Sequence, residues 1–185
     1  AMKKYTAFAL LAMTFMLSCK KTGVNCEENV NPEKLTSQQI DAFIKKKFEA
    51  DHRFEWSSAS DQIIWSALQE SDRVLSVGFM PAGISAADIK LETVDINDEK
   101  WMNAKKEVLN IILTEEQKLN KNITLNDIIQ WQENVLPVID VNVSSFSTTQ
   151  KLRACNLVRY AEPMGYEPKE VAGKVLSSSG CGSNT

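Results

Sequence analysis

Residues 74–83, VLSVGFMPAG, decide the fold of this chain. The side chains at 74, 76, 78 and 80 alternate with those of Leu75, Val77 and Phe79, which is the period-two pattern of a half-buried strand. Pro-Ala-Gly at 81–83 ends the strand, because proline cannot donate to a sheet ladder and glycine favours a turn. The elements that follow this strand determine the class of the domain.

A long amphipathic helix is predicted from near residue 98. Its apolar stripe consists of Trp101, Ala104, Val108 and Ile112. We predict two strands after it, at 128–131 and 135–143, then a short helix at 147–155 and a last strand at 157–161 that Glu162-Pro163 ends. A weaker strand is expected at 89–96. Thr124-x-x-Asp127 leaves open a capped helical turn in place of the second strand.

The predicted order is strand, helix, strand, strand, helix, strand, which is typical of a ferredoxin-like α+β domain. In that class two helices cover one face of a four-stranded antiparallel sheet. Extra helices precede it, because Thr36-x-x-Gln39 is a capping box and helical spacing continues from Ile40, with a second helix at 61–70. We divide the chain into a leader at 1–18, a tether at 19–35, a helical segment at 36–72, the α+β domain at 73–166 and a flexible linker or tail at 167–185.

The N-terminus has the pattern of an export signal. Lys3 and Lys4 precede an apolar run at 5–17 that is too short to span a bilayer but has the length of a signal-peptide core. The run ends at Met16-Leu17-Ser18-Cys19, which resembles the lipobox of bacterial lipoproteins, although leucine is commoner in place of Met16. The resemblance implies lipidation at Cys19 and an exported protein anchored to the membrane, in the periplasm or at the cell surface. The alternative is an ordinary signal peptide with a coincidental cysteine.

Composition and charge narrow the possible partners. Removing 18 of the 185 residues leaves 167, enough for one domain of ordinary size, and removing the two leader lysines takes the formal net charge from −3 to −5. An acidic chain without a basic run argues against nucleic acid. Of the remaining cysteines, Cys26 and Cys181 are the disulfide candidates, and no spacing predicts a zinc site or a cofactor.

The sequence predicts no catalytic residue in this chain. The only histidine, His52, lies in a polar stretch and is interpreted as a solvated surface residue. No Gly-x-Ser-x-Gly motif accompanies it, so a serine triad has neither a recognisable nucleophile nor a placed base.

Three segments together resemble the inhibitor-type propeptides of bacterial subtilisin-like serine proteases. Residues 75–79, LSVGF, resemble their opening strand, and residues 138–145, VIDVNVSS, resemble their third strand. Leu152 followed by 157–163, LVRYAEP, resembles the helix and strand that end these domains. The resemblance covers about half of the chain. The long first helix, the helices at 36–70 and the Ser/Gly-rich end depart from the family pattern.

The resemblance implies a pro-region that acts as an intramolecular chaperone and as an inhibitor of its protease. Its sheet would pack on the protease, and the residues after the last strand would pair with the substrate cleft. The implied cleft-binding residues are Tyr160, Glu162, Pro163, Met164, Gly165 and Tyr166. Glu133 and Asp140 are candidates for an acid that caps a helix N-terminus of the protease. The implied partner is a subtilisin-like protease domain in the same precursor.

Two other functions remain open. The chain is alternatively a free-standing lipoprotein that inhibits proteases, or a lipoprotein whose sheet binds a ligand other than a protease. A reading frame that continues into a catalytic domain would favour the pro-region, and a stop codon after Thr185 would favour the other two.

Overall fold

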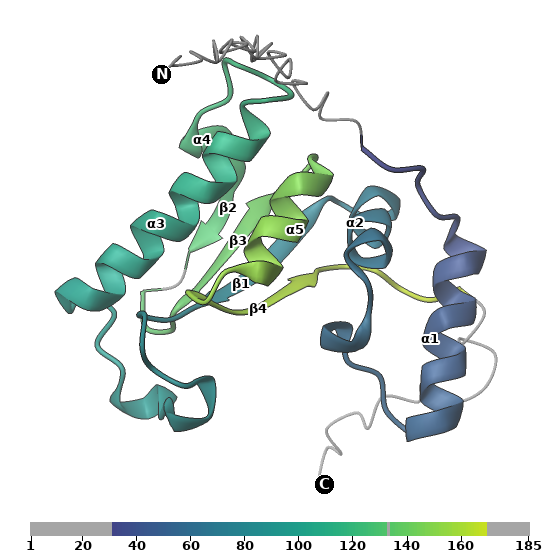
Figure 1. Cartoon of the computed structure of the whole chain (residues 1–185), viewed down its shortest axis with the longest axis horizontal. Coiled ribbons are helices and arrows are strands. Elements are labelled where there is room, and N and C mark those ends of the chain that lie inside the picture. Colours follow the sequence, from purple (N-terminus) through teal and green to yellow (C-terminus); the bar gives the residue numbers. More distant parts are fainter. Residues whose placement is uncertain (1–30, 133, 170–185) are drawn as a thin grey trace, which may run out of the picture.

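The computed structural model describes residues 31–132 and 134–169. It is an α+β fold, as predicted, with one four-stranded antiparallel sheet in the order β2-β3-β1-β4 (Figure 1). The strands are β1 (Val74–Phe79), β2 (Ile129–Gln132), β3 (Val138–Asn142) and β4 (Val158–Pro163). The longer helices are α1 (Ser37–Asp51), α2 (Asp61–Glu70), α3 (Glu99–Glu116) and α5 (Phe146–Ala154). Within the described residues, no helix has the length and apolarity needed to cross a membrane.

One face of the sheet carries the core. Leu75, Val77 and Phe79 of β1 are buried there, as their alternation predicts, beside Ile139 and Val141 of β3. Helices α3 and α5 lie over this face (Figure 1) and share one apolar cluster with it. Its helical members include the predicted stripe of α3, which is Trp101, Ala104, Val108 and Ile112, and Leu152 of α5. The opposite face of the sheet has no covering helix in the described part of the chain.

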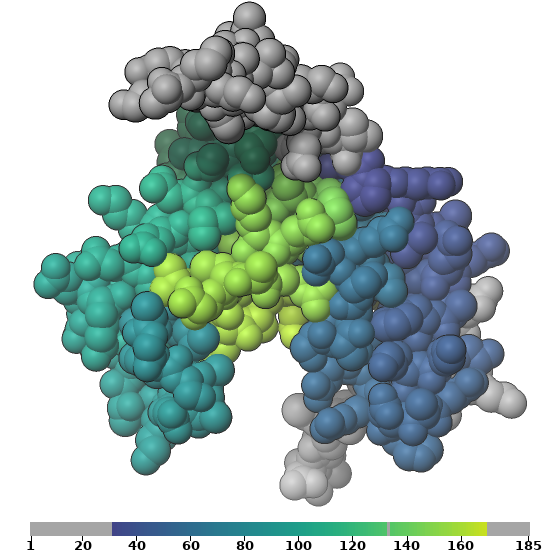
Figure 2. Space-filling model, in the orientation of Figure 1, coloured from purple at the N-terminus to yellow at the C-terminus, as the bar shows by residue number. Residues whose placement is uncertain are grey.

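The helical segment before β1 belongs to the same body. The capping box predicted at Thr36 is present, with Gln39 N–H donating to Thr36 Oγ1 at 3.3 Å. Helix α2 places Ile64 and Leu68 in the main core, whereas Ile40 and Ile44 of α1 form a second cluster against the outer side of α2. Figure 2 shows α1 and α2 on one side of β4 and α5, and α3 with the loop before it on the other.

Several predicted boundaries are wrong. Residues 89–96 form no strand; they contain one short 3₁₀ turn, Leu91–Thr93, and a second turn, Ala86–Asp88, precedes them. Only Ile89 and Val94 of that segment pack on the core, so its contacts do not repeat with period two. The helical turn at Thr124 and the second strand both occur, as α4 (Leu125–Ile128) followed directly by β2. The last strand continues through Glu162 and Pro163 instead of ending before them.

The expected tether also has a folded part. Leu35 N–H donates to Ser66 Oγ at 3.0 Å, Lys34 pairs with Glu70 at 2.6 Å, and Asn31 Oδ1 accepts from the N–H of Phe146 at 2.8 Å. Residues 31–35 are therefore part of the domain, because they form hydrogen bonds and an ion pair with residues of α2 and α5. The expected leader at 1–18 and the rest of the tether lie outside the described residues.

Candidate functional site

The uncovered face of the sheet carries a row of side chains that crosses all four strands. Trp131 of β2 lies opposite Asp140 of β3, Asp140 lies opposite Ser76 of β1, and Ser76 lies opposite Glu162 of β4. Neighbours in such a row have Cβ atoms about 5 Å apart. Trp131 is 50% exposed, which is unusual for so large an apolar side chain. The row joins an exposed aromatic ring to two acids and constitutes our candidate interaction site.

A second pair of residues shapes the same face. Tyr160 lies opposite Gly78, and its ring lies so close that a Cβ built on Gly78 would come within 2.3 Å of it. The register shifts here, so Arg159 is an extra residue in β4, and its guanidinium lies over the Tyr160 ring at 5.2 Å from the centroid. Glycine at position 78 is thus required for the tyrosine to lie flat on the sheet.

The ionised side chain of Glu162 is electrostatically unfavourable in this position. Its pKa is raised, first by burial and then by the negative charge of Glu55. Neither a hydrogen bond nor an ion pair holds its carboxylate within residues 31–132 and 134–169. A half-buried acid of this kind gains from any partner that supplies positive charge or hydrogen-bond donors.

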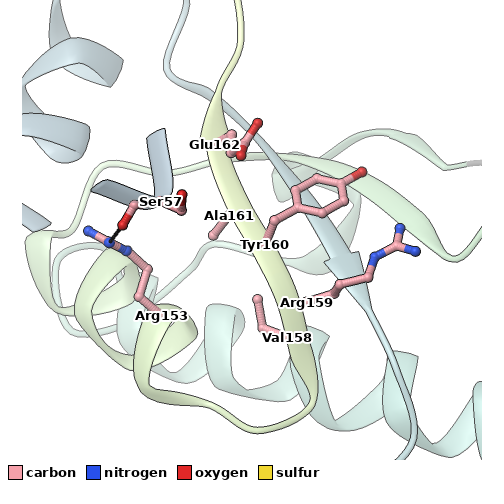
Figure 3. A pocket seen from close by; sticks show the side chains of 7 residues that line it. All are labelled: Ser57, Arg153, Val158, Arg159, Tyr160, Ala161 and Glu162. Atoms are coloured by element: carbon pink, nitrogen blue, oxygen red, sulfur yellow. Dashed lines mark hydrogen bonds between the residues drawn. The ribbon is translucent and has the colours of Figure 1, made fainter. Parts of the chain in front are cut away.

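Beside the outer edge of β4 there is an open pocket (Figure 3). Ser57, Arg153 and Glu162 are among its lining residues. Arg153 is not free to bind a ligand there, because it donates to the backbone oxygens of Ser57 and Ala59 and pairs with Asp61 at 2.9 Å. These bonds tie α5 to the start of α2, so the pocket is an edge of the candidate site and not an independent centre.

The chain leaving β4 turns back onto α1. Met164 N–H donates to Val74 O at 2.8 Å, and Gly165 adopts φ of +73°, a left-handed conformation that suits glycine. Tyr166 Oη then donates to Asp41 Oδ1 at 2.7 Å, and Lys169 N–H donates to Asp41 Oδ2 at 3.0 Å. Burial and the Asp41 carboxylate raise the pKa of Tyr166.

The six residues predicted to bind a protease cleft therefore have different environments. Tyr160, Glu162 and Pro163 belong to β4, with Pro163 buried and the other two on the uncovered face. Met164 and Gly165 are exposed, whereas Tyr166 is held by α1. Glu162 thus belongs to the row on the sheet, Tyr160 lies beside the row on the same face, and no continuous six-residue extended tail leaves β4.

Two buried acids that the sequence reasoning missed hold α5 in place. Glu116 of α3 accepts from the N–H groups of Ser144 and Ser145, each at 3.1 Å, and from the hydroxyl of Thr148 at 2.6 Å. It therefore caps the N-terminus of α5, where the helix dipole favours a negative charge. The sequence contained one indication of this role, since two adjacent acids at the C-terminal end of a helix are unfavourable with that helix's own dipole and therefore suggest another partner.

Glu115 makes a second, charged contact to the same helix. Burial opposes ionisation of Glu115, but hydrogen bonds from Lys118, Lys151 and Ser147 outweigh it and lower the pKa to about 2. Both lysine contacts are 2.6 Å long. Acid capping thus occurs inside this domain, whereas capping of a protease helix by Glu133 or Asp140 stays a prediction.

The remaining predicted residues are placed as follows. Asp140 lies in the row on the uncovered face, at a position where it can meet a partner. Cys19, Cys26, Glu133 and Cys181 lie outside the described residues. His52 is exposed and ends α1 with φ of 55°, so in this structure it has the role of a helix C-cap. Among the described residues, no group of three or more side chains is arranged to hold a metal ion.

Comparison with known proteins adds no relative. No protein-family model, no curated protein and no solved structure matches this chain.

Proposed function

We propose that this chain is the pro-region of an exported subtilisin-like serine protease and that it acts on the protease as folding chaperone and inhibitor. The observation that carries the proposal is the one-sided sheet. Its helices cover one face, while the other presents Trp131, Asp140 and Glu162 in one row. Tryptophan is enriched among the residues that dominate binding interfaces, so the half-exposed Trp131 supports a binding role for this face.

The finer fold class is part of the proposal. From β1 onward the main elements follow the order βαββαβ, and the strands are ordered β2-β3-β1-β4. This arrangement supports a ferredoxin-like domain, the class to which the propeptide resemblance leads. The inserted turn α4 and the preceding helices α1 and α2 are additions to that plan.

The proposed mechanism follows from the chemistry of the uncovered face. Docking of the row on native protease, but not on its unfolded chain, stabilises the native protease by mass action, which is the chaperone effect. In this mechanism, Asp140 and Glu162, which lie on the uncovered face, accept hydrogen bonds from helix N-termini of the protease, where an anion is favoured. In the proposed complex, chain that lies C-terminal to the segment held on α1 occupies the substrate cleft and blocks it. Lipidation at Cys19 would hold the precursor at the membrane until processing. The proposal gives the chain no catalytic residue, no cofactor and no contact with nucleic acid.

One observation favours a second candidate, a free-standing protease inhibitor. Residues 164–169 are bound to α1 through Asp41, so the domain closes on itself at its C-terminal side. A self-contained module of this kind could act without a covalently attached protease. Continuation of the reading frame into a catalytic domain separates the two candidates.

Inhibition assays with two matched variants test the proposed face. Trp131→Ala removes an apolar side chain that is 50% exposed on the uncovered face, and Met102→Ala removes one that is 51% exposed on α3. We expect the chain to inhibit a member of a panel of subtilisin-like proteases with a Ki of about 10 nM or lower, and Trp131→Ala to weaken this about tenfold or more. Met102→Ala should change it less than about twofold. Absence of inhibition at about 1 mM across the panel, or an equal loss in both variants, would refute the proposal.

A further inference from the structure

Helix α1 contains a buried carboxylate that binds the other end of the domain. Asp41 is 1% exposed, although it lies on a helix that packs at the periphery of the fold. It accepts from Tyr166 Oη and from Lys169 N–H, 125 and 128 residues away in the sequence. A buried carboxylate is costly unless it is hydrogen-bonded, so these contacts hold both segments together.

Apolar contacts reinforce the same junction. The Tyr166 ring packs edge-on against Trp56, with centroids 5.9 Å apart, and joins the cluster formed by Ile40, Ile44 and Ala67. Tyr166 Oη lies also 3.2 Å from Ser37 O. The phenol is therefore fixed at its ring and at its hydroxyl, and the backbone is fixed again three residues later at Lys169.

We infer that Asp41 is a positioning residue that clamps residues 164–169 to α1, so that Met164, Gly165 and Tyr166 are held on the domain and do not enter a partner's cleft. We call Asp41, Tyr166 and Lys169 the Asp41 clamp. The segment before β1 then has a structural role, since it supplies the acceptor Asp41 and the Trp56 ring that packs against Tyr166. The clamp also withholds Met164, Gly165 and Tyr166 from the cleft-binding role that the family resemblance gave them.

The consequence for inhibition rests on the proposed function. A peptide that enters a cleft binds more tightly when its departure point is fixed, because less chain entropy is lost on binding. Opening the clamp should therefore weaken inhibition. If residues 164–166 were themselves the cleft-binding segment, opening the clamp would free them and strengthen inhibition. The sign of the change separates the two arrangements.

The clamp itself is tested on the purified full chain without any partner protease. Limited digestion with trypsin is followed by mass spectrometry, which gives the rate of cleavage after Lys169. We expect Asp41→Ala to raise this rate about tenfold or more, as loss of hydrogen bonds to a charged acceptor would do to a local opening equilibrium. Tyr166→Phe, which removes only the phenol oxygen, should raise it by a smaller factor and keeps the test valid if Asp41→Ala folds poorly.

Glu49→Gln is the matched control. Glu49 lies exposed on the same helix α1, and it makes no hydrogen bond or ion pair within the described residues. We expect this variant to leave cleavage after Lys169 unchanged. Equal cleavage in the wild-type chain, Asp41→Ala and Tyr166→Phe would overturn the clamp, as would an equal increase in Glu49→Gln.

Inhibition by the same variants tests the positioning role. We expect Asp41→Ala to raise the inhibition constant about tenfold, with an unchanged far-UV circular dichroism spectrum. An unchanged or lower inhibition constant would overturn the positioning role even if trypsin shows that the clamp exists. A wild-type chain that inhibits no subtilisin-like protease would instead refute the proposed function, and the trypsin result would still decide whether the clamp forms.

Discussion

The cap that Glu116 places on α5 gives the sharpest stability prediction. Its carboxylate is 2% exposed and is the described acceptor for the N–H groups of Ser144 and Ser145 and for the hydroxyl of Thr148. Glu116→Ala removes the acceptor and leaves three donors at a junction from which water is largely excluded. Water can enter only if α5 moves away from α3, which would open the core beside Leu152.

The expected cost follows from these contacts. Each hydrogen bond to a charged acceptor contributes about 1.5–3 kcal/mol, and an unsatisfied buried donor costs about 1–3 kcal/mol. These contributions overlap, and removing the buried charge recovers part of its desolvation cost. We therefore expect Glu116→Ala to lower the free energy of unfolding by about 3–5 kcal/mol. For a chain of this length that corresponds to a fall in melting temperature of roughly 6–20 °C.

Urea unfolding followed by far-UV circular dichroism measures this difference. Glu107→Ala is the control, because Glu107 lies exposed on the same helix and loses the same side chain. We expect Glu107→Ala to change the free energy of unfolding by less than about 0.5 kcal/mol. If the two variants differ by less than about 1 kcal/mol, Glu116 does not cap α5 in solution and the reasoning fails.

Three further predictions follow from the structure. The pKa of Glu115 in the folded chain is lowered to about 2, so the ionised side chain stabilises the fold fully above the ordinary pKa of 4.5, and this stabilisation is lost as the pH falls toward 2. Glu115→Gln should therefore make the free energy of unfolding depend less on pH between those two values. Gly78→Ala should lower the free energy of unfolding, measured by thermal unfolding, by about 1–3 kcal/mol, because the new methyl group meets the Tyr160 ring. The loss should be much smaller in a Tyr160→Ala background, and equal losses in both backgrounds would exclude the clash. Glu162→Gln should stabilise the isolated chain at pH 7 and not at pH 4, because burial and Glu55 raise the pKa of Glu162; a loss of stability at pH 7 would contradict this.

Apolar periodicity predicted the parts of this fold that depend on burial. Leu75, Val77 and Phe79 are buried where their alternation places them, and the stripe from Trp101 to Ile112 faces the sheet. Each of these signals is local, because the period of the backbone alone decides which side chains share a face. The same rule failed at 89–96, where apolar residues contact the core one at a time and pair with none of the described strands.

Polar contacts between distant segments could not be predicted in this way. Glu116 and Ser145 are 29 residues apart, and Asp41 and Tyr166 are 125 residues apart, with no spacing that relates them. Their positions depend on how the helices pack, which the sequence pattern specifies only after the topology is known. The same holds for Asn31, which lies in a segment that reads as a polar linker but accepts from the first N–H of α5.

Glu162 affects both the stability of this domain and its proposed function. Its raised pKa means that the ionised side chain is less favourable in the folded chain than in the unfolded chain, so this residue costs stability as pH rises above about 4.5. It lies in the same row as Trp131 and Asp140, on the face of the sheet that none of the described helices covers. A partner that supplies helix N–H donors or a cation would stabilise the ionised side chain and offset this loss of stability. Glu162→Gln should therefore have opposite effects on the two properties, with a more stable isolated chain and a weaker complex. A variant that gains in both would show that the uncovered face has no use for a charge at this position.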